Sequence, residues 1–322
     1  MGINISQLGF GLSGIAGSGN YQHQEKLVRT AIDCGVTHFD VAPYYGSGDA
    51  EKILGKILAN CREKVTITTK YGLMPLGGGA GGSILRKVLR PVFNRAKSLK
   101  RLASAVVKNN TASPNVKTFV TGALSTSLRE SERKLKRPAD ILLLHDADIE
   151  FATNTEIIYE LDMARGQGAV LLTGISGKAN AIIDVVNWRP GTYAVAQLEN
   201  SLTLPAPVPQ LRGYGANVIT HRAIQGGLEQ LTYLIQKRPG FKQVWVREIG
   251  IEPTPDNLAQ ALVELALSEN PTGTILFSTT KIDRVKKITN AINRPLLDKK
   301  RSLEIRRLFD AVHLQREKVD VQ

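Results

Sequence analysis

The stretch GFGLSG at residues 9–14 decides between two folds. Its Gly-x-Gly-x-x-Gly spacing matches the dinucleotide-binding fingerprint of a Rossmann fold, and Asp40 follows roughly where that fold places its ribose-binding acid. The fingerprint requires a helix to begin at the glycines, because the pyrophosphate lies at the helix N-terminus. Here IAGSGNYQHQ follows, and the first helical pattern starts only near Gln24, ten residues after Gly14. We therefore predict a glycine-rich loop after a first strand.

Eight short strand patterns alternate with longer helical patterns along the chain. The strands are predicted at residues 7–12, 37–42, 65–70, 140–146, 169–176, 193–198, 217–222 and 273–278. The central runs are continuously apolar and β-branched, as expected for parallel strands that are buried on both faces. Eight strands with intervening helices predict an α/β protein, a (β/α)8 TIM barrel. With no linker or change of composition, we expect residues 1–322 to form a single domain.

The composition excludes several classes of protein. No apolar run reaches the roughly 18 residues that a membrane span needs, and the N-terminus lacks the pattern of a secretory signal. The two cysteines, Cys34 and Cys61, are too few for a disulfide framework or a zinc site, so no metal is expected. A reducing cytoplasm is the predicted location.

The net charge of +13 is concentrated in one segment. Residues 83–108 carry eight Lys or Arg and no Asp or Glu. They lie in a predicted insertion, residues 73–117, between the third strand and its helix. A second departure from a simple barrel is a basic, partly helical C-terminal tail, residues 295–322.

Titratable residues follow three consecutive predicted strands. Asp40 and Tyr45 lie in FDVAPYYG, Lys70 in TTKYG and His145 in LLLHDAD. Because active sites of (β/α)8 barrels are built at the C-terminal ends of the strands, we expect these four groups to meet at one mouth. Each alone could be a core histidine or a surface charge, but their convergence indicates a catalytic site.

The chemistry of these four groups is consistent with carbonyl reduction. A tyrosine hydroxyl has a pKa near 10, and a nearby ammonium such as that of Lys70 lowers it. Asp40 would hold Lys70 as its ion-pair partner, and His145 would orient a carbonyl oxygen. Tyr45 would then donate the proton that reduction needs. Since no side chain donates hydride, a nicotinamide cofactor is implied.

The chain resembles the aldo-keto reductases from LGFGLSG to about Asn290. The most specific stretch is GVTHFDVAPYYGSGDAEKILGKIL, followed by TTKYG, LLLHDAD, GISG and QLENS. Members of that family carry an Asp, Tyr, Lys, His tetrad on a (β/α)8 barrel and bind NADPH or NADH without a Rossmann fold. The five-residue step from Asp40 and the following glycine select Tyr45 over Tyr44 as the acid.

The resemblance also implies where a nicotinamide would bind. Gly11 lies in the first loop, near the nicotinamide. Ser176 is kept in GISG, whereas Gly177 replaces the Asn that usually holds the carboxamide, and Gln197 matches the family glutamine for that amide. His221 takes the position of an aromatic ring that stacks on the nicotinamide.

The rest of the cofactor site carries over by position. The expected contacts are Arg222, Ile224, Gln225 and Gly227 along the pyrophosphate, and Ser278, Thr279, Thr280, Lys281 and Arg284 at the adenosine end. Two cations and three hydroxyls suit a 2′-phosphate, which favours NADPH over NADH. Ile288 stands where family members usually have an Asn.

The basic segment 83–108 allows three interpretations. Its apolar residues recur at three- and four-residue steps, an amphipathic helical pattern interrupted by Pro91. It could be a lid packed on the barrel, a lid whose cations also meet an anionic substrate, or a helix that contacts an acidic membrane surface or partner. No nucleic-acid partner is expected, because aromatic residues are not interleaved with the cations.

The expected function is an NAD(P)H-dependent oxidoreductase that reduces an aldehyde or ketone, or oxidises the corresponding alcohol or sugar. The alternative is a catalytically weak regulatory or scaffold protein that binds the cofactor on the same barrel.

Overall fold

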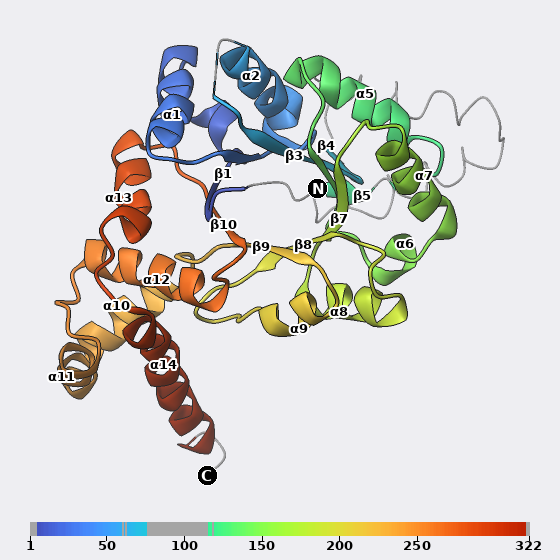
Figure 1. Ribbon diagram of the computed structural model, residues 1–322. Helices are drawn as coiled ribbons and strands as arrows, with labels where there is room; N and C mark the ends of the chain where they lie inside the picture. The colour runs from blue at the N-terminus through green and yellow to red at the C-terminus, as the bar shows by residue number, and fades with distance from the viewer. Residues whose placement is uncertain (1–4, 60, 62, 76–114, 118, 320–322) are drawn as a thin grey trace.

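Eight parallel strands close into a barrel, as predicted (Figure 1). The computed structural model describes residues 5–59, 61, 63–75, 115–117 and 119–319. The barrel strands are β1 (Leu8–Gly11), β2 (His38–Asp40), β3 (Thr66–Tyr71), β6 (Ile141–His145), β7 (Leu172–Ser176), β8 (Val195–Glu199), β9 (Asn217–His221) and β10 (Thr274–Phe277). Hydrogen-bonded neighbours run β1-β10-β9-β8-β7-β6-β3-β2 and back to β1.

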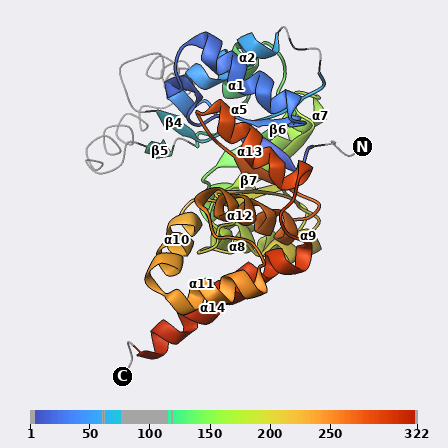
Figure 2. The same cartoon turned by 90° about the vertical axis from the view of Figure 1, so that its left-hand side faces the viewer.

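Helices surround the barrel in both views (Figures 1 and 2). They are α1 (Tyr21–Asp33), α2 (Asp49–Leu58), α5 (Leu124–Leu135), α6 (Ile149–Ala152), α7 (Thr155–Gly166), α8 (Ala179–Trp188), α9 (Val208–Gly213), α10 (Gly227–Lys237), α11 (Pro239–Glu248), α12 (Pro255–Glu269), α13 (Ile282–Asn293) and α14 (Lys299–Val319). Two 3-10 turns, η1 (Ile15–Gly17) and η2 (Tyr45–Gly48), follow the first two strands. Among the described residues, no helix combines the length and the apolar character needed to cross a membrane.

The first helix begins earlier than predicted. It starts at Tyr21 instead of near Gln24, because the side chain of Asn20 accepts a hydrogen bond from the backbone N–H of His23 and caps the helix. Six residues still separate Gly14 from the helix, and η1 lies among them. The geometry of the dinucleotide fingerprint is therefore absent, as the sequence analysis concluded.

The ends of the predicted insertion form a small hairpin that the sequence analysis did not predict. Strand β4 (Leu73–Pro75) pairs antiparallel with β5 (Asn115–Lys117). The amphipathic pattern at 83–108 lies outside the described residues. The predicted tail contains helix α14, which packs against α11 and α12 (Figure 2).

Alternate residues of each barrel strand face the lumen. The lower lumen is filled by the apolar side chains of Ile141, Leu143, Val195, Ile219 and Leu276. On β2, His38 points to the same side as Asp40, two residues further on. The His38 ring is completely buried, with Nδ1 at 2.9 Å from Thr66 Oγ1 and Nε2 at 3.3 Å from Thr68 Oγ1.

Burial of His38 predicts a loss of stability in acid. Burial lowers the pKa of His38 to about 4, from about 6.5, so the unfolded chain binds more protons than the folded chain between these two values. The free energy of unfolding therefore falls as the pH drops from about 6.5 to about 4, by up to about 3 kcal/mol from this residue. Urea unfolding at several pH values should show a smaller loss in His38→Gln than in the unmodified protein. His23→Gln, at a partly exposed site, is the control, and an equal loss in both variants would contradict the assignment.

A buried ion pair joins two helices to the strand that carries Lys70. Lys134 Nζ of α5 lies 3.3 Å from Glu51 Oε2 of α2, and Thr69 Oγ1 of β3 donates to Glu51 Oε1 at 2.9 Å. Thr69 faces the helices, so its neighbour Lys70 faces the lumen. This network holds β3 in place from outside the barrel. The inner face of β3 contributes Lys70 to the mouth of the barrel.

Candidate active site

Three neighbouring strands bring the four predicted catalytic residues together. In the barrel, β2, β3 and β6 lie side by side, so Asp40, Lys70 and His145 meet near their C-terminal ends. Tyr45 begins η2, five residues beyond Asp40. The convergence predicted from the sequence is therefore present.

Lys70 is bonded to two of the other three groups. Its Nζ forms a short ion pair with Asp40 Oδ1 and donates to the Tyr45 hydroxyl at 2.9 Å. The side chains of Lys70 and Asp40 are 2% and 4% exposed, so water screens their attraction little. Burial works against the charge of Lys70, but Asp40 and Tyr45 outweigh it and raise the pKa of Lys70. Lys70 is accordingly an ammonium at neutral pH.

The Tyr45 hydroxyl is protonated in this environment. Burial raises its pKa, and Lys70, although it lowers the pKa as the sequence analysis expected, does not fully offset that burial. The net direction is thus opposite to the one inferred from Lys70 alone. A protonated phenol beside an ammonium is arranged to donate a proton to an oxygen that becomes negatively charged.

His145 presents an unpaired polar atom beside Tyr45. The two rings are 5.8 Å apart between centroids and nearly perpendicular, at 86°. Burial, together with Lys70 and His221, holds the pKa of His145 well below its usual value, so the ring is neutral. Its Nδ1 is buried and has no hydrogen-bond partner among the described residues. Since buried polar atoms are nearly always paired, this atom indicates a place for a polar ligand group.

Gln197 of β8 also lies in the site. Its Nε2 donates to Asp40 Oδ2 at 2.7 Å, so Asp40 is held by Lys70 on one oxygen and by Gln197 on the other. Ser176, also predicted, is buried at the end of the adjacent strand β7.

Gly177 leaves room for a side chain. A Cβ built at this position would approach Ala147 O at 3.4 Å, which is ordinary contact. Nothing in the local backbone therefore requires glycine here.

The end of β9 holds the next predicted contacts. His221 is half-buried, and burial lowers its pKa to about 4, so its ring is uncharged. Arg222 adopts a left-handed backbone conformation, φ 64°, and its Nη1 lies 2.9 Å from Glu199 Oε2. Gln225 is exposed, whereas Ile224 packs partly against the core.

Gly227 has a structural reason to be glycine. It begins α10, and a Cβ here would lie 2.9 Å from the Cβ of Leu202. Close packing of α10 against the loop after β8 thus accounts for this glycine without a ligand. The preceding Gly226, at φ 73°, makes the turn into the helix.

The predicted adenosine-end residues form one loop beside α1. Ser278 Oγ donates to Gly11 O at 2.7 Å, which ties two predicted contacts to each other. Thr279 Oγ1 accepts from the backbone N–H of Lys281 at 3.1 Å, and His23 Nε2 lies 2.9 Å from Thr280 O.

Two cations of this loop form no ion pair within the part of the chain that the structure describes. Lys281 and Arg284 are exposed at the start of α13, and neither forms an ion pair with any residue in the described ranges. Ile288, one turn further along α13, packs partly against the core.

Glu199 is a site residue that the sequence analysis missed. It lies at the end of β8 within the quoted QLENS, and it joins Ser201 to Arg222, which is 23 positions away. No local pattern marks it, because its role depends on the pairing of β8 with β9.

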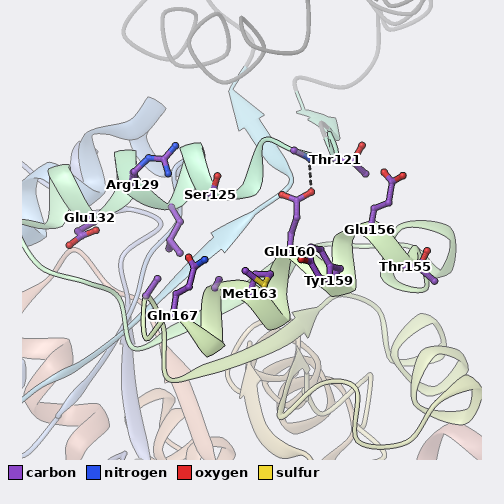
Figure 3. A pocket seen from close by; sticks show the side chains of 14 residues that line it. Thr121, Ser125, Arg129, Glu132, Thr155, Glu156, Tyr159, Glu160, Met163 and Gln167 are labelled. Carbon is purple, nitrogen blue, oxygen red and sulfur yellow. Dashed lines mark hydrogen bonds between the residues drawn. The ribbon is translucent and has the colours of Figure 1, made fainter. Parts of the chain in front are cut away.

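A groove of about 830 Å³ lies elsewhere, on the outside of the barrel between α5 and α7 (Figure 3). Within it, Glu160 accepts from the backbone N–H of Gly122 at 2.5 Å and of Leu124 at 3.2 Å, so this carboxylate caps the start of α5. The exposed side chains of Tyr159 and Met163 form part of its wall. None of the four converging residues lines the groove, so it is not the candidate active site.

Comparison with known proteins places the chain in a family. The model of the Aldo/keto reductase family matches residues 7–308. The chain is 38% identical over 81 residues to probable aldo-keto reductase 1 from Glycine max, covering 24% of this chain and 23% of that protein. It is 37% identical over 110 residues to L-glyceraldehyde 3-phosphate reductase from Escherichia coli (strain K12), covering 31% of each. It is 27% identical over 244 residues to L-galactose dehydrogenase from Arabidopsis thaliana, covering 70% of this chain and 64% of that protein.

The matched regions thus span less than two thirds of each of these relatives. Among solved structures, aldo-keto reductase AKR11C1 from Bacillus halodurans (holo form) is similar, with a TM-score of 0.70, 17% identity, and coverage of 95% of this chain and 93% of that one. Glycerol dehydrogenase AKR11B4 from Gluconobacter oxydans has a TM-score of 0.69 at 17% identity, covering 96% and 92%. At this identity the likeness concerns the fold. Because the family model spans residues 7–308, this chain belongs to the aldo/keto reductase family.

Proposed function

We propose that this protein is a nicotinamide-dependent oxidoreductase that reduces an aldehyde or ketone, or oxidises the corresponding alcohol. The observation that carries the proposal is the buried chain from Asp40 through Lys70 to the Tyr45 hydroxyl, beside a neutral His145 with an unpaired Nδ1. These groups can orient a carbonyl compound and protonate its oxygen. Carbonyl reduction needs that proton together with a hydride on the carbonyl carbon.

In this proposal each residue has one task. Asp40, held by Gln197, keeps Lys70 charged and in place. Lys70 donates to the Tyr45 oxygen and stabilises it as the phenolic proton leaves for the substrate oxygen. His145 hydrogen-bonds that same substrate oxygen. In the oxidative direction, Tyr45 takes the proton back.

The residues at the mouth fit a nicotinamide cofactor, which when bound supplies or accepts the hydride. Ser176 and the side-chain oxygen of Gln197 would hold the carboxamide, and the uncharged ring of His221 would stack on the nicotinamide. Arg222 is the proposed pyrophosphate contact. The cations Lys281 and Arg284 lie at the N-terminus of α13, where a helix end also favours an anion.

The two unpaired cations predict a preference for NADPH over NADH. If they bind the 2′-phosphate, Lys281→Ala and Arg284→Ala should each weaken NADPH binding about tenfold or more, since hydrogen bonds between charged groups contribute about 1.5–3 kcal/mol. NADH binding should change less than twofold. Fluorescence titration of both cofactors measures this, with the exposed Lys286→Ala on the same helix as control. Equal losses for both cofactors would argue against a 2′-phosphate site.

The proposed substrate is a small hydroxylated carbonyl compound or the matching alcohol. The names of two relatives, L-glyceraldehyde 3-phosphate reductase and L-galactose dehydrogenase, both refer to such compounds. Glyceraldehyde and galactose are accordingly the first substrates to try. Both described cysteines are free thiols, which supports the proposed cytoplasmic location.

The deciding experiment combines cofactor titration with turnover. We expect quenching of protein fluorescence by NADPH and consumption of NADPH when glyceraldehyde is added. Binding without turnover of any aldehyde, ketone or sugar would favour the regulatory alternative on the same barrel. Failure to bind either NADPH or NADH would overturn the proposal.

A further inference from the structure

One half-buried arginine of the C-terminal helix α14 reaches the loop that follows β8. The side chain of Arg306 is 14% exposed and forms a two-pronged contact with Glu269 at the end of α12. Nε lies 2.9 Å from Oε1, and Nη2 lies 3.2 Å from Oε2. Such a planar fork is specific to arginine, because the lysine ammonium has no matching geometry.

The same guanidinium binds the loop that follows β8. Nη2 donates to the carbonyl of Ser201 at 2.9 Å, and Nη1 donates to the carbonyl of Leu202. Residues 200–207 between β8 and α9 have no helix or strand of their own. Glu269 also accepts from Asn200 Nδ2 at 2.9 Å. Arg306 and Glu269 together therefore hold the start of this loop from outside the barrel.

The loop in turn contacts two proposed cofactor residues. Ser201 Oγ donates to Glu199 Oε1 at 2.9 Å, and the other oxygen of Glu199 accepts from Arg222 at 2.9 Å. The backbone N–H of Asn200 donates to the carbonyl of His221 at 3.0 Å. A continuous set of hydrogen bonds thus runs from α14 to His221 and Arg222.

Arg222 needs such support. It adopts a left-handed backbone conformation that few residues other than glycine adopt. Its ion pair with Glu199 is half-exposed, at 54% and 23%, and exposed pairs contribute little on their own. Ser201 fixes the Glu199 carboxylate, and Arg306 fixes the loop that carries Ser201. The ion pair between Glu199 and Arg222 is thereby held in one geometry.

We propose that Arg306 is a positioning residue for cofactor binding, acting through Ser201 and Glu199 on Arg222. This inference rests on the proposed function, since the contact of Arg222 with the cofactor belongs to that proposal. It assigns to helix α14 a role at the mouth of the barrel, although α14 packs against α11 and α12 (Figure 2).

Cofactor binding provides the first test. Arg306→Ala should raise the Kd and KM for NADPH about tenfold, with kcat at saturating NADPH within threefold of the unmodified enzyme. Arg306→Lys, which keeps the charge but loses the fork, should show a smaller increase in the same constants. Arg307→Ala, an exposed neighbour paired with Glu304, is the matched control. An unchanged Kd in both Arg306 variants, or a fall in kcat with no change in KM, would overturn the proposal.

A double-mutant cycle tests the route. If Arg306 acts through Glu199, then Arg306→Ala should change the Kd less than twofold in a Glu199→Gln background. If instead the increases in Kd caused by the two single substitutions multiply in the double variant, Arg306 does not act through Glu199.

Amide hydrogen exchange tests the positioning without any cofactor. In Arg306→Ala the amides of Asn200, Leu204 and Ala206, which are bonded within this network, should exchange at least tenfold faster. In Arg306→Ala, the amides of β3 should keep the exchange rates of the unmodified protein. In the control Arg307→Ala, the three loop amides should also keep those rates. If the unmodified protein binds no NADPH, the proposed function fails and the cofactor-positioning role of Arg306 fails with it, whereas the exchange measurement separately shows whether Arg306 holds the loop after β8. Unchanged exchange, or acceleration throughout the barrel, would overturn the proposal.

Discussion

Replacement of Tyr45 by Phe is expected to reduce kcat by about 10²–10⁴-fold, the range typical of losing a general acid. The phenol is the group bonded to Lys70 at 2.9 Å, and phenylalanine keeps the ring contact with His145 while removing the proton. Binding of NADPH should stay within twofold, because the hydroxyl lies with the catalytic groups and not with the proposed cofactor contacts. Stopped-flow or steady-state consumption of NADPH with glyceraldehyde measures the loss.

Tyr44→Phe is the matched control for this substitution. Tyr44 precedes Tyr45 and its ring also lies near His145, at 6.4 Å between centroids. We expect Tyr44→Phe to keep most of the activity. If Tyr44→Phe abolishes turnover and Tyr45→Phe does not, the assignment of the acid is wrong.

Replacement of Lys70 by Met should reduce kcat by a similar factor. Methionine fills the same space but removes the ammonium that stabilises the Tyr45 oxygen as its proton leaves. Since Lys70 and Tyr45 act as one unit, Lys70→Met combined with Tyr45→Phe should be no slower than the slower single variant by more than about threefold. Enzymes with linked catalytic groups show this non-additivity.

The pH dependence distinguishes catalysis from folding in the Lys70 variant. In Lys70→Met burial still raises the Tyr45 pKa, and the opposing effect of Lys70 is gone. The basic limb of the pH–rate profile should therefore move to higher pH. Thermal unfolding of the variant provides the control for stability, because Asp40 loses one partner while Gln197 remains. If the kcat losses of the two single variants multiply when Lys70→Met and Tyr45→Phe are combined, Lys70 and Tyr45 do not act as one unit.

The barrel and the four converging residues were predictable from the sequence. The central strands have a local pattern of apolar and β-branched residues, and helical patterns with a 3.6-residue period separate the strands, so the eight strands could be located. Asp40, Lys70 and His145 each stand near the end of a strand pattern, and parallel strands of a barrel end at one mouth. The resemblance to the aldo-keto reductases, through the spacing from Asp40 and the glycine that follows, selected Tyr45 over Tyr44. The start of α1 was misplaced by three residues, because the cap at Asn20 precedes the apolar face of the helix.

Contacts between distant segments needed the tertiary structure. Gln197 donates to Asp40 across 157 positions, and Arg306 reaches Ser201 across 105. The protonated state of Tyr45 depends on how deeply the barrel buries it, which the identity of its neighbour Lys70 does not reveal. Hydrophobic period and strand order are properties of short segments, so the sequence by itself determined them. Burial, pKa and long-range hydrogen bonds depend on which segments the closed barrel brings together, and only the folded chain decided those.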